Sequence, residues 1–197
     1  MSKVSARWAL KLLSEEEKQT RSRCSAVFLE RYAAEGDEFL DRIVTTDETC
    51  LHHYDLEMKA LSSVLKRDYV NVLKRKRPAL DLDRVILHQD NAPVHRANST
   101  QLEITLLGFE LLEHPPYSPD LAPMDFRTFP EIKTSLRGQR FHDVADLTLA
   151  TSRKVSQLDT DWYRETFTKW IARHQKYVAL CGDYVEKVRR SLDLDNV

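Results

Sequence analysis

The chain has 197 residues, with 30 Lys and Arg against 31 Asp and Glu and only 4 Gly. This length fits a single domain with at most a short appendage, and its core can form without disulfides or a structural metal. Apolar residues make up 42 % and the net charge is −1, which argues against intrinsic disorder. Three widely spaced cysteines (Cys24, Cys50 and Cys181) and short apolar runs exclude a disulfide framework and a membrane span. We therefore expect a helix-rich protein of the cytosol or nucleus.

The first predicted element is a helix over Glu15–Ala34. Ser14 followed by Glu17 has the spacing of a capping box, in which the Ser hydroxyl and the Glu carboxylate accept each other's backbone N–H groups. Gly36 is a typical residue just beyond a helix end. Residues 1–13 are a basic, irregular lead-in that is too short to contain a helix-turn-helix module.

Three strands are predicted after this helix. Asp41–Thr49 is rich in β-branched residues, Arg84–Asp90 is short and apolar, and Phe109–Leu112 follows a Gly. A helix over Asn98–Leu107 lies between the second and third strands. This order predicts a parallel pair with a right-handed crossover.

The segments between the first two strands are harder to interpret. Residues 56–65 favour neither helix nor strand, whereas Tyr69–Arg77 has helical spacing and ends before Pro78. This helix ends in a basic run, which is either a solvated helix face or a weak nucleic-acid-binding patch. The run consists of Lys74, Arg75, Lys76 and Arg77.

The C-terminal half begins with a proline-rich stretch. Four of the seven prolines lie within residues 115–123, so we expect a rigid loop there. Helices are predicted over Phe126–Leu136 and, from Val144 onward, over two further segments. The last helix is amphipathic, and its aromatic residues favour a core role over base stacking; they include Trp162, Phe167, Trp170 and Tyr177.

Three aspartates lie at or near the ends of these predicted elements. Asp47 lies near the end of the first strand, Asp90 at the end of the second, and Asp125 at the start of a helix. Parallel strands place their carboxyl ends at one edge of a sheet, so the first two could converge. Converging carboxylates repel unless cations neutralise them, and their hard oxygens select Mg²⁺ or Mn²⁺. Each aspartate alone could equally be a turn or helix-cap residue, and the histidines from His88 to His95 lack the companion cysteines of a zinc site.

Several strings of residues resemble the mariner transposases. Val44–Asp55 resembles the first catalytic motif of that family, His88–His95 the second and His114–Phe126 the third, and 34 residues separate Asp90 from Asp125, as in the family's D,D(34)D signature. Trp170–Tyr184 is similar to the family's C-terminal helix and tail. Within the motifs Asn91, His95, Tyr117 and Pro119 support the match. The resemblance covers nearly the whole chain.

The resemblance implies an α/β, RNase H-like catalytic domain with flanking helices that cuts and joins DNA strands. Asp47, Asp90 and Asp125 would be its catalytic metal ligands, holding two Mg²⁺ ions, with Mn²⁺ as a substitute. Residues 1–13 would be the remnant of an interdomain linker and residues 14–197 the catalytic domain. The implied partners are DNA and a second copy of the chain, and no membrane is implied. The implied location is the nucleus, or the cytoplasm by default.

The sequence also departs from the family pattern. Only 42 residues separate Asp47 from Asp90, about half the family interval, so we expect an internal deletion between about residues 60 and 67. Cys50 and Met124 stand where the family usually has Trp and Ser. The deletion would remove two strands of a hairpin and reduce the sheet. The first strand would then be a bare edge that self-associates, or it would be covered by the helix Glu15–Ala34 or by Leu56–Leu65.

Two functions therefore remain open from the sequence. The chain could be an impaired metal-dependent transposase core. Alternatively, it could be a catalytically inactive relic or domesticated module that binds protein or, without sequence preference, DNA. We expect recognition of transposon ends to be missing, because no helix-turn-helix pair precedes the catalytic motifs.

Overall fold

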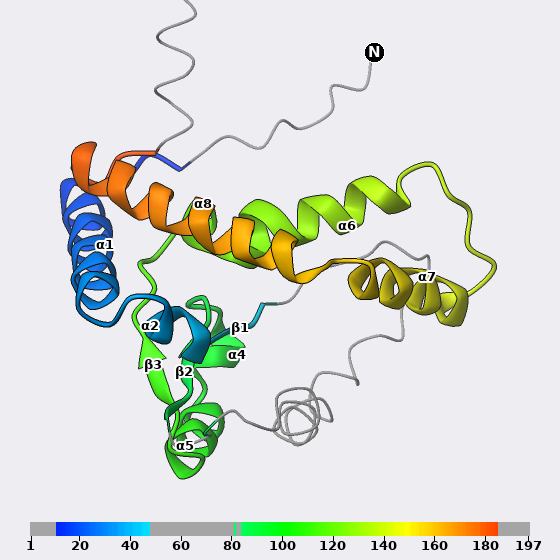
Figure 1. Cartoon of the computed structure of the whole chain (residues 1–197), viewed down its shortest axis with the longest axis horizontal. Helices are drawn as coiled ribbons and strands as arrows, with labels where there is room; N and C mark the ends of the chain where they lie inside the picture. Colours follow the sequence, from blue (N-terminus) through cyan, green and yellow to red (C-terminus); the bar gives the residue numbers. More distant parts are fainter. Residues whose placement is uncertain (1–10, 48–80, 82–83, 185–197) are drawn as a thin grey trace, which may run out of the picture.

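The computed structural model describes residues 11–47, 81 and 84–184. Figure 1 shows α1 and the small sheet at one end of the molecule and α6 and α7 at the other, with α8 running between them. The elements in chain order are α1 (Glu15–Glu35), α2 (Asp37–Arg42), β1 (Ile43–Thr45), β2 (Ile86–His88), α4 (Pro93–Arg96), α5 (Asn98–Leu106), β3 (Glu110–Leu112), the 3₁₀ turn η3 (Pro119–Leu121), the π-helical turn η4 (Met124–Thr128), α6 (Phe129–Leu136), α7 (Val144–Ser156) and α8 (Thr160–Ala179).

Helix α1 begins and ends where its sequence predicts, to within one residue. The Ser14 hydroxyl accepts the Glu17 N–H at 3.2 Å, and the Glu17 carboxylate accepts the Ser14 N–H at 2.8 Å. The predicted capping box is thus confirmed. The helix ends at Gly36, whose φ of 61° lies in the left-handed region that glycine adopts without strain.

The described sheet has three parallel strands in the order β1-β2-β3. Ile43 pairs with Ile86 across the first two strands, and Ile86 in turn pairs with Glu110 on β3. The predicted parallel pairing of the second and third strands, connected through helices, is confirmed. β1 and β3 form the edges of this sheet as far as the structure describes it.

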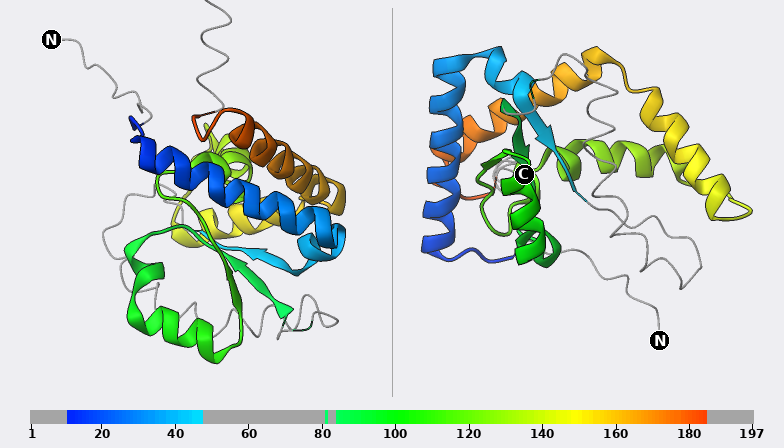
Figure 2. Two further views of the ribbon diagram at one scale, coloured as in Figure 1. Left: turned by 90° about the vertical axis from the view of Figure 1, so that its left-hand side faces the viewer. Right: turned by 90° about the horizontal axis from the view of Figure 1, so that it is seen from below.

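The two faces of the sheet are covered by different helices (Figure 2). Ile43 and Ile86 face a core to which α1 and α8 contribute Phe28 and Trp170. Val44 and Leu87 alternate to the opposite face, where α5 contributes Ile104. α1 therefore packs on a face of the sheet rather than over the edge of β1. The prediction that the helix Glu15–Ala34 could cover that edge is wrong.

Two predictions near element ends, for Asp41–Arg42 and for Asp125, are wrong for local reasons. Asp41 and Arg42 belong to α2 and not to a strand, because acidic residues in its first turn and the buried Phe39 favour a short helix there. The proline-rich stretch is the predicted loop, in which Pro119–Leu121 forms the 3₁₀ turn η3. Asp125 lies within η4 rather than at the start of a regular helix. Pro130 has no N–H to donate to Phe126, so the α-helical ladder starts only at α6.

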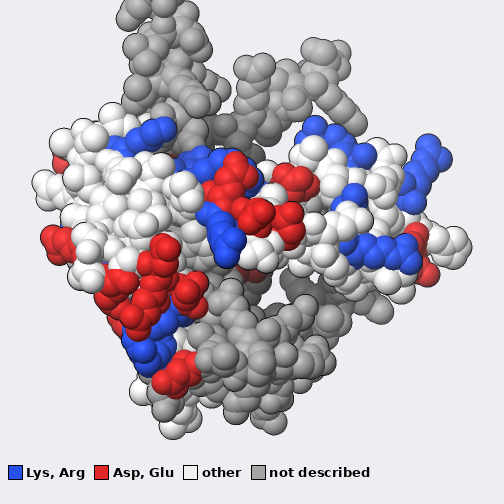
Figure 3. Space-filling view, in the orientation of Figure 1, with Lys and Arg blue, Asp and Glu red and all other residues white. Residues whose placement is uncertain are grey.

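Helices α6 and α7, with the turn between them, form a hairpin that we call the α6–α7 hairpin. Its small core consists of Ile132, Leu136 and Leu147, against which Phe141 packs. Lys and Arg side chains gather over this end of the molecule in the view of Figure 3. Among the described helices, none is both long and apolar enough to cross a membrane.

Several expectations fall outside the described residues. These are the ambiguous segment 56–65, the helix over 69–77 with its basic run Lys74–Arg77, the internal deletion and most of the linker remnant in 1–13. They remain predictions.

Candidate active site

Three carboxylates lie beside one end of the sheet. Asp47 stands two residues beyond β1, Asp90 two residues beyond β2, and Asp125 is on η4. Because β1 and β2 are parallel, their carboxyl ends lie side by side and place Asp47 and Asp90 at the same end of the sheet. The loop after β3 then returns the chain so that η4 brings Asp125 to this end.

The electrostatics of Asp125 show that the three carboxylates influence one another. The pKa of Asp125 is raised to about 6, first by burial and then by the negative charge of Asp47, to which its carboxyl group is hydrogen-bonded. The charge of Asp90 raises this pKa further, and Lys133 lowers it. Carboxylates that repel in this way attract cations strongly. Their hard oxygens are the donors that Mg²⁺ and Mn²⁺ prefer, so the residues present fit such ions.

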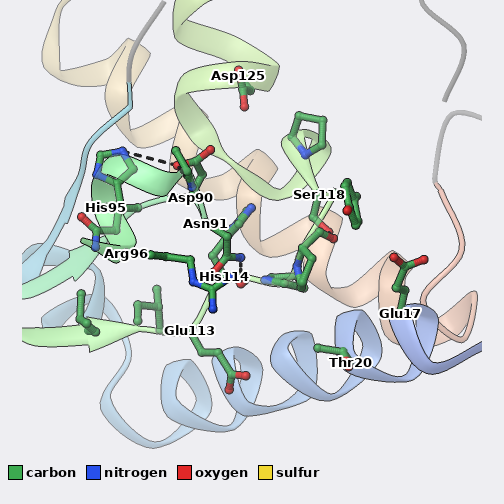
Figure 4. Close-up of a pocket in the computed structure, with 18 of the residues that line it drawn as sticks. Glu17, Thr20, Asp90, Asn91, His95, Arg96, Glu113, His114, Ser118 and Asp125 are labelled. Carbon is green, nitrogen blue, oxygen red and sulfur yellow. Dashed lines mark hydrogen bonds and ion pairs between the residues drawn. The ribbon is translucent and has the colours of Figure 1, made fainter. Parts of the chain in front are cut away.

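Asp90 is held by its own loop (Figure 4). Its Oδ1 accepts the backbone N–H of Ala92 at 2.9 Å and lies 3.4 Å from Nε2 of His95. Asn91 donates its side-chain N–H to the carbonyl of His114 at 2.7 Å, which ties the loop after β2 to the loop after β3. Asn91 and His95 thus position the second aspartate.

A chain of side-chain contacts connects Thr45 at the end of β1, His88 at the end of β2 and His114 just beyond β3. Thr45 Oγ1 lies 3.2 Å from Nδ1 of His88, and Nε2 of His88 lies 3.1 Å from Nδ1 of His114. Burial lowers the pKa of His88 well below its usual value and that of His114 to about 4. Both rings are therefore neutral at physiological pH, so each hydrogen bond has one donor and one acceptor.

The loop that carries the third motif is anchored by a fully buried arginine. Arg21 of α1 pairs with Asp120 at 3.2 Å and donates to Ser118 Oγ at 2.7 Å and to the carbonyl of Gly182 at 2.7 Å. Its guanidinium lies between the rings of Tyr177 and Tyr184, at 4.5 and 4.4 Å. α8 fixes the next part of the loop, where Trp170 Nε1 donates to the carbonyl of Leu121 at 2.7 Å.

Tyr117 and Pro119 belong to the same loop. Tyr117 has φ of 53°, and its carbonyl accepts hydrogen bonds from Arg21 and from the Tyr184 hydroxyl. Its ring is 56 % exposed and lies under the Lys11 ammonium, 3.2 Å from the ring centroid. The Pro119 carbonyl accepts the N–H of Ala122 and so closes η3.

A pocket of about 970 Å³ with a mixed polar and apolar lining lies beside the carboxylates. Asp90 and Asp125 line one part of it, and Tyr117, Glu17 and Thr20 line another (Figure 4). Among its lining residues Arg96 is exposed, and its side chain makes no ion pair or hydrogen bond within the described part of the chain. The pocket is thus an open groove that leads to two of the three aspartates.

The structure brings some predicted site residues together and leaves others untested. Five of them lie together at the carboxyl ends of the strands: Asp47, Asp90, Asp125, Asn91 and His95. The basic run Lys74–Arg77 lies outside the described residues. Within the described residues no three Asp, Glu, His or Cys side chains already surround one point as metal ligands do. The carboxylates adjoin one another without forming a closed cage.

Sequence reasoning missed Arg21 and the histidine pair. Arg21 could have been found, because it shares helical spacing with the buried residues Cys24, Ser25 and Phe28 of α1. The contact of His88 with His114 has no comparable signal, because it depends on how strands distant in sequence pair.

No family model matches the chain. The human histone-lysine N-methyltransferase SETMAR is 35 % identical over 133 residues, covering 68 % of this chain and 18 % of SETMAR. The Mariner Mos1 transposase of Drosophila mauritiana is 35 % identical over 116 residues, covering 58 % of this chain and 34 % of that protein. The chain thus corresponds to about a third or less of the length of these relatives.

A solved structure of the catalytic domain of the Mos1 mariner transposase matches with a TM-score of 0.79 at 28 % identity, covering 90 % of this chain and 99 % of that domain. The chain belongs to the mariner transposase family. Its described part is an RNase H-like catalytic domain in which the described sheet has three strands. A Mos1 catalytic domain solved with Raltegravir and Mn matches similarly, with a TM-score of 0.78 at 28 % identity over 88 % of this chain and 98 % of that one.

Proposed function

We propose that this mariner catalytic domain cleaves and joins DNA strands with the help of divalent cations held by Asp47, Asp90 and Asp125. The observation that carries the proposal is that carboxylates from three separate elements lie together at the carboxyl ends of β1 and β2, where burial and then the charges of Asp47 and Asp90 raise the pKa of Asp125 to about 6. A protein keeps such repulsion where a cation offsets it. The relatedness to Mos1, whose catalytic domain has been solved with Mn and with Mg, supports the same choice of ions.

Each part of the site would have a separate task. Asp47, Asp90 and Asp125 would bind two ions, which when present would acidify an attacking water or hydroxyl and stabilise the leaving oxygen of a phosphodiester. Asn91, His95 and the His88–His114 pair hold the loops after β2 and β3 in place. The groove beside Asp90 and Asp125 would admit a DNA strand, and its arginine, Arg96, would bind a phosphate there.

The proposed partners follow from the relatives. Mos1 has been solved as a transpososome and as a paired-end complex with its left transposon end. We extend this to DNA as the substrate and to a homodimer as the working assembly. Because the substrate would be chromosomal DNA, we propose a nuclear location.

The test is nicking of supercoiled plasmid with Mn²⁺ or Mg²⁺. The purified chain should convert supercoiled to open-circular DNA, and Asp90→Asn and Asp125→Asn should each abolish this conversion. Glu110→Gln is the matched control, because it removes a surface carboxylate of β3 that points to Arg31. Residual nicking by Asp90→Asn at the wild-type rate would assign the activity to another site or a contaminant.

A second candidate is a binding module without catalysis. It is favoured by the absence, within the described residues, of three ligands already arranged around one point. Thermal melting separates the two functions. Mg²⁺ or Mn²⁺ should raise the melting temperature of the wild-type chain and not that of Asp125→Asn, whereas a relic would show neither stabilisation nor nicking.

A further inference from the structure

The α6–α7 hairpin differs from the rest of the described chain in its charge. Its residues, 129–156, contain five Lys and Arg and three Asp and Glu. None of these five cations makes an ion pair within the part of the chain that the structure describes. Four are exposed and Lys154 is half-buried. They are Lys133, Arg137, Arg140, Arg153 and Lys154.

Four arginines at the other end of the molecule have carboxylate partners. Arg23 pairs with Glu113, Arg31 with Glu110 and Arg42 with Glu35, and Arg84 pairs with Glu38 at 2.6 Å. In Figure 3 blue side chains lie mostly alone over the hairpin, whereas red and blue lie together near α1 and β3. The two ends of the molecule therefore differ in whether their cations have carboxylate partners.

Helix-end electrostatics accounts for only some of these cations. Arg153 and Lys154 lie in the last turn of α7 and Lys133 in the last turn of α6, where positive charge favours the helix dipole. Arg137 is the C-cap residue of α6 and so also lies at the negative end of that dipole, whereas Arg140 lies in the turn beyond, where the dipole does not account for its charge.

The cations follow the length of the hairpin toward the carboxylates. Lys154 lines a small hollow with Glu131 and Trp162, beside the first turn of α6, while Arg137 and Arg140 lie at the far turn. At ~1.5 Å per residue α7 alone is about 20 Å long, which matches roughly six base pairs of duplex. Lys133 is close enough to Asp125 to lower its pKa. A linear polyanion along the hairpin would thus pass the proposed catalytic site.

We propose that the α6–α7 hairpin binds the sugar-phosphate backbone of duplex DNA, without sequence preference, next to the carboxylates. This inference rests on the proposed function, because it names the surface that holds the substrate. It is separate from the basic run Lys74–Arg77, which lies outside the described residues.

The test measures how strongly binding depends on salt. A fluorescein-labelled 30-base-pair duplex of arbitrary sequence is titrated with the full chain in EDTA, across about 50–200 mM KCl. The hairpin variant carries Arg137→Gln, Arg140→Gln, Arg153→Gln and Lys154→Gln. Its matched control carries Arg23→Gln, Arg31→Gln, Arg42→Gln and Arg84→Gln, which is the same change in net charge on cations that have carboxylate partners. Circular dichroism verifies that both are folded.

The hairpin variant should reduce the slope of log K against log salt by about 3–4 and weaken binding at ~50 mM salt by at least about 30-fold. The control should reduce the slope by less than about 1. Equal weakening in both variants would mean that only net charge matters and would overturn the proposal. An unchanged slope with a changed sedimentation coefficient would also overturn it, because the hairpin would then bind a second copy of the chain.

Failure of this inference is distinguishable from failure of the proposed function. Plasmid nicking by the wild-type chain, with unchanged DNA binding by the hairpin variant, would leave the catalytic proposal standing and remove the hairpin surface. If the wild-type chain never nicks plasmid but the hairpin variant shows a smaller salt slope, the proposed DNA-binding surface stands and the catalytic proposal fails.

Discussion

The two ends of this molecule use charge in opposite ways. Around α1 and the sheet, several arginines pair with carboxylates, and the fully buried Arg21 connects α1, the third-motif loop and the turn at Gly182. At the α6–α7 hairpin the core is small and the cations are exposed. The body around α1 thus holds the third-motif loop through buried contacts, whereas the hairpin presents exposed cations. The following substitutions test this division.

The largest effect is expected at Arg21. Arg21→Met should lower the free energy of unfolding by about 3–5 kcal/mol, because it leaves the buried Asp120 carboxylate without its cation. Urea denaturation measures this loss. Arg23→Met, on the exposed side of the same helix, should cost less than about 1 kcal/mol. Similar losses in the two variants would show that the buried charge has no special role in the body.

The hairpin core should respond more weakly and locally. Leu147→Ala should cost about 2–3 kcal/mol, because it opens a cavity against Ile132 and Leu136. In hydrogen exchange monitored by mass spectrometry, α6 and α7 should lose protection while α1 keeps it. Uniform loss of protection across α1 and α7 would mean that the two ends unfold as one unit.

The carboxylate site should show a pH-dependent cost. The pKa of Asp125 is raised from 3.8 to about 6, so the folded state holds a proton that the unfolded state has lost, and stability falls as the pH rises through this window. Asp125→Asn should therefore be more stable than the wild type above pH 6, by about 1 kcal/mol after solvent screening, and no more stable at pH 3.5. Thermal melts in EDTA at several pH values measure the difference. A gain that does not depend on pH would point to packing instead of charge.

The smallest effect is expected from an exposed ion pair. Arg84→Gln breaks the contact with Glu38 and should lower the melting temperature only slightly at low salt, because both side chains are exposed. The difference from the wild type should shrink at ~1 M NaCl, because salt screens exposed charges. A larger cost that persists at high salt would place this pair among the rigid contacts of the body.

The sequence predicts structure most strongly where the signal is local. The start of α1 follows from Ser14 and Glu17, and its end from Gly36, all within a few residues of the boundary. Short apolar runs locate β2 and β3 but overestimate their extents, because the length of a strand is set by backbone pairing with its neighbours and not by the apolar run itself. The sequence does not reveal α4, because Pro93 starts a single helical turn that the extended backbone of Ala97 ends.

The candidate site is partly predictable for a related reason. Asp47 and Asp90 could be placed at one sheet edge because parallel strands end together, and Asp125 followed from a motif spacing. The contacts that hold these loops could not be predicted, since Arg21 with Asp120 and His88 with His114 join residues far apart in sequence. Such contacts depend on the assembled fold.

The contact between α1 and the C-terminal turn has a consequence for biosynthesis. Arg21 meets the carbonyl of Gly182 across 161 positions, and Ser25 meets His174 across 149. At about 5–20 residues per second, a ribosome needs roughly 10–30 s to make the partners of a helix that has already emerged. During that interval Phe28 and the uncompensated Arg21 stay in water, so chaperones that bind apolar segments have time to act on α1. A slowed or stalled translation of the last helix would lengthen that exposure and increase aggregation of the nascent chain.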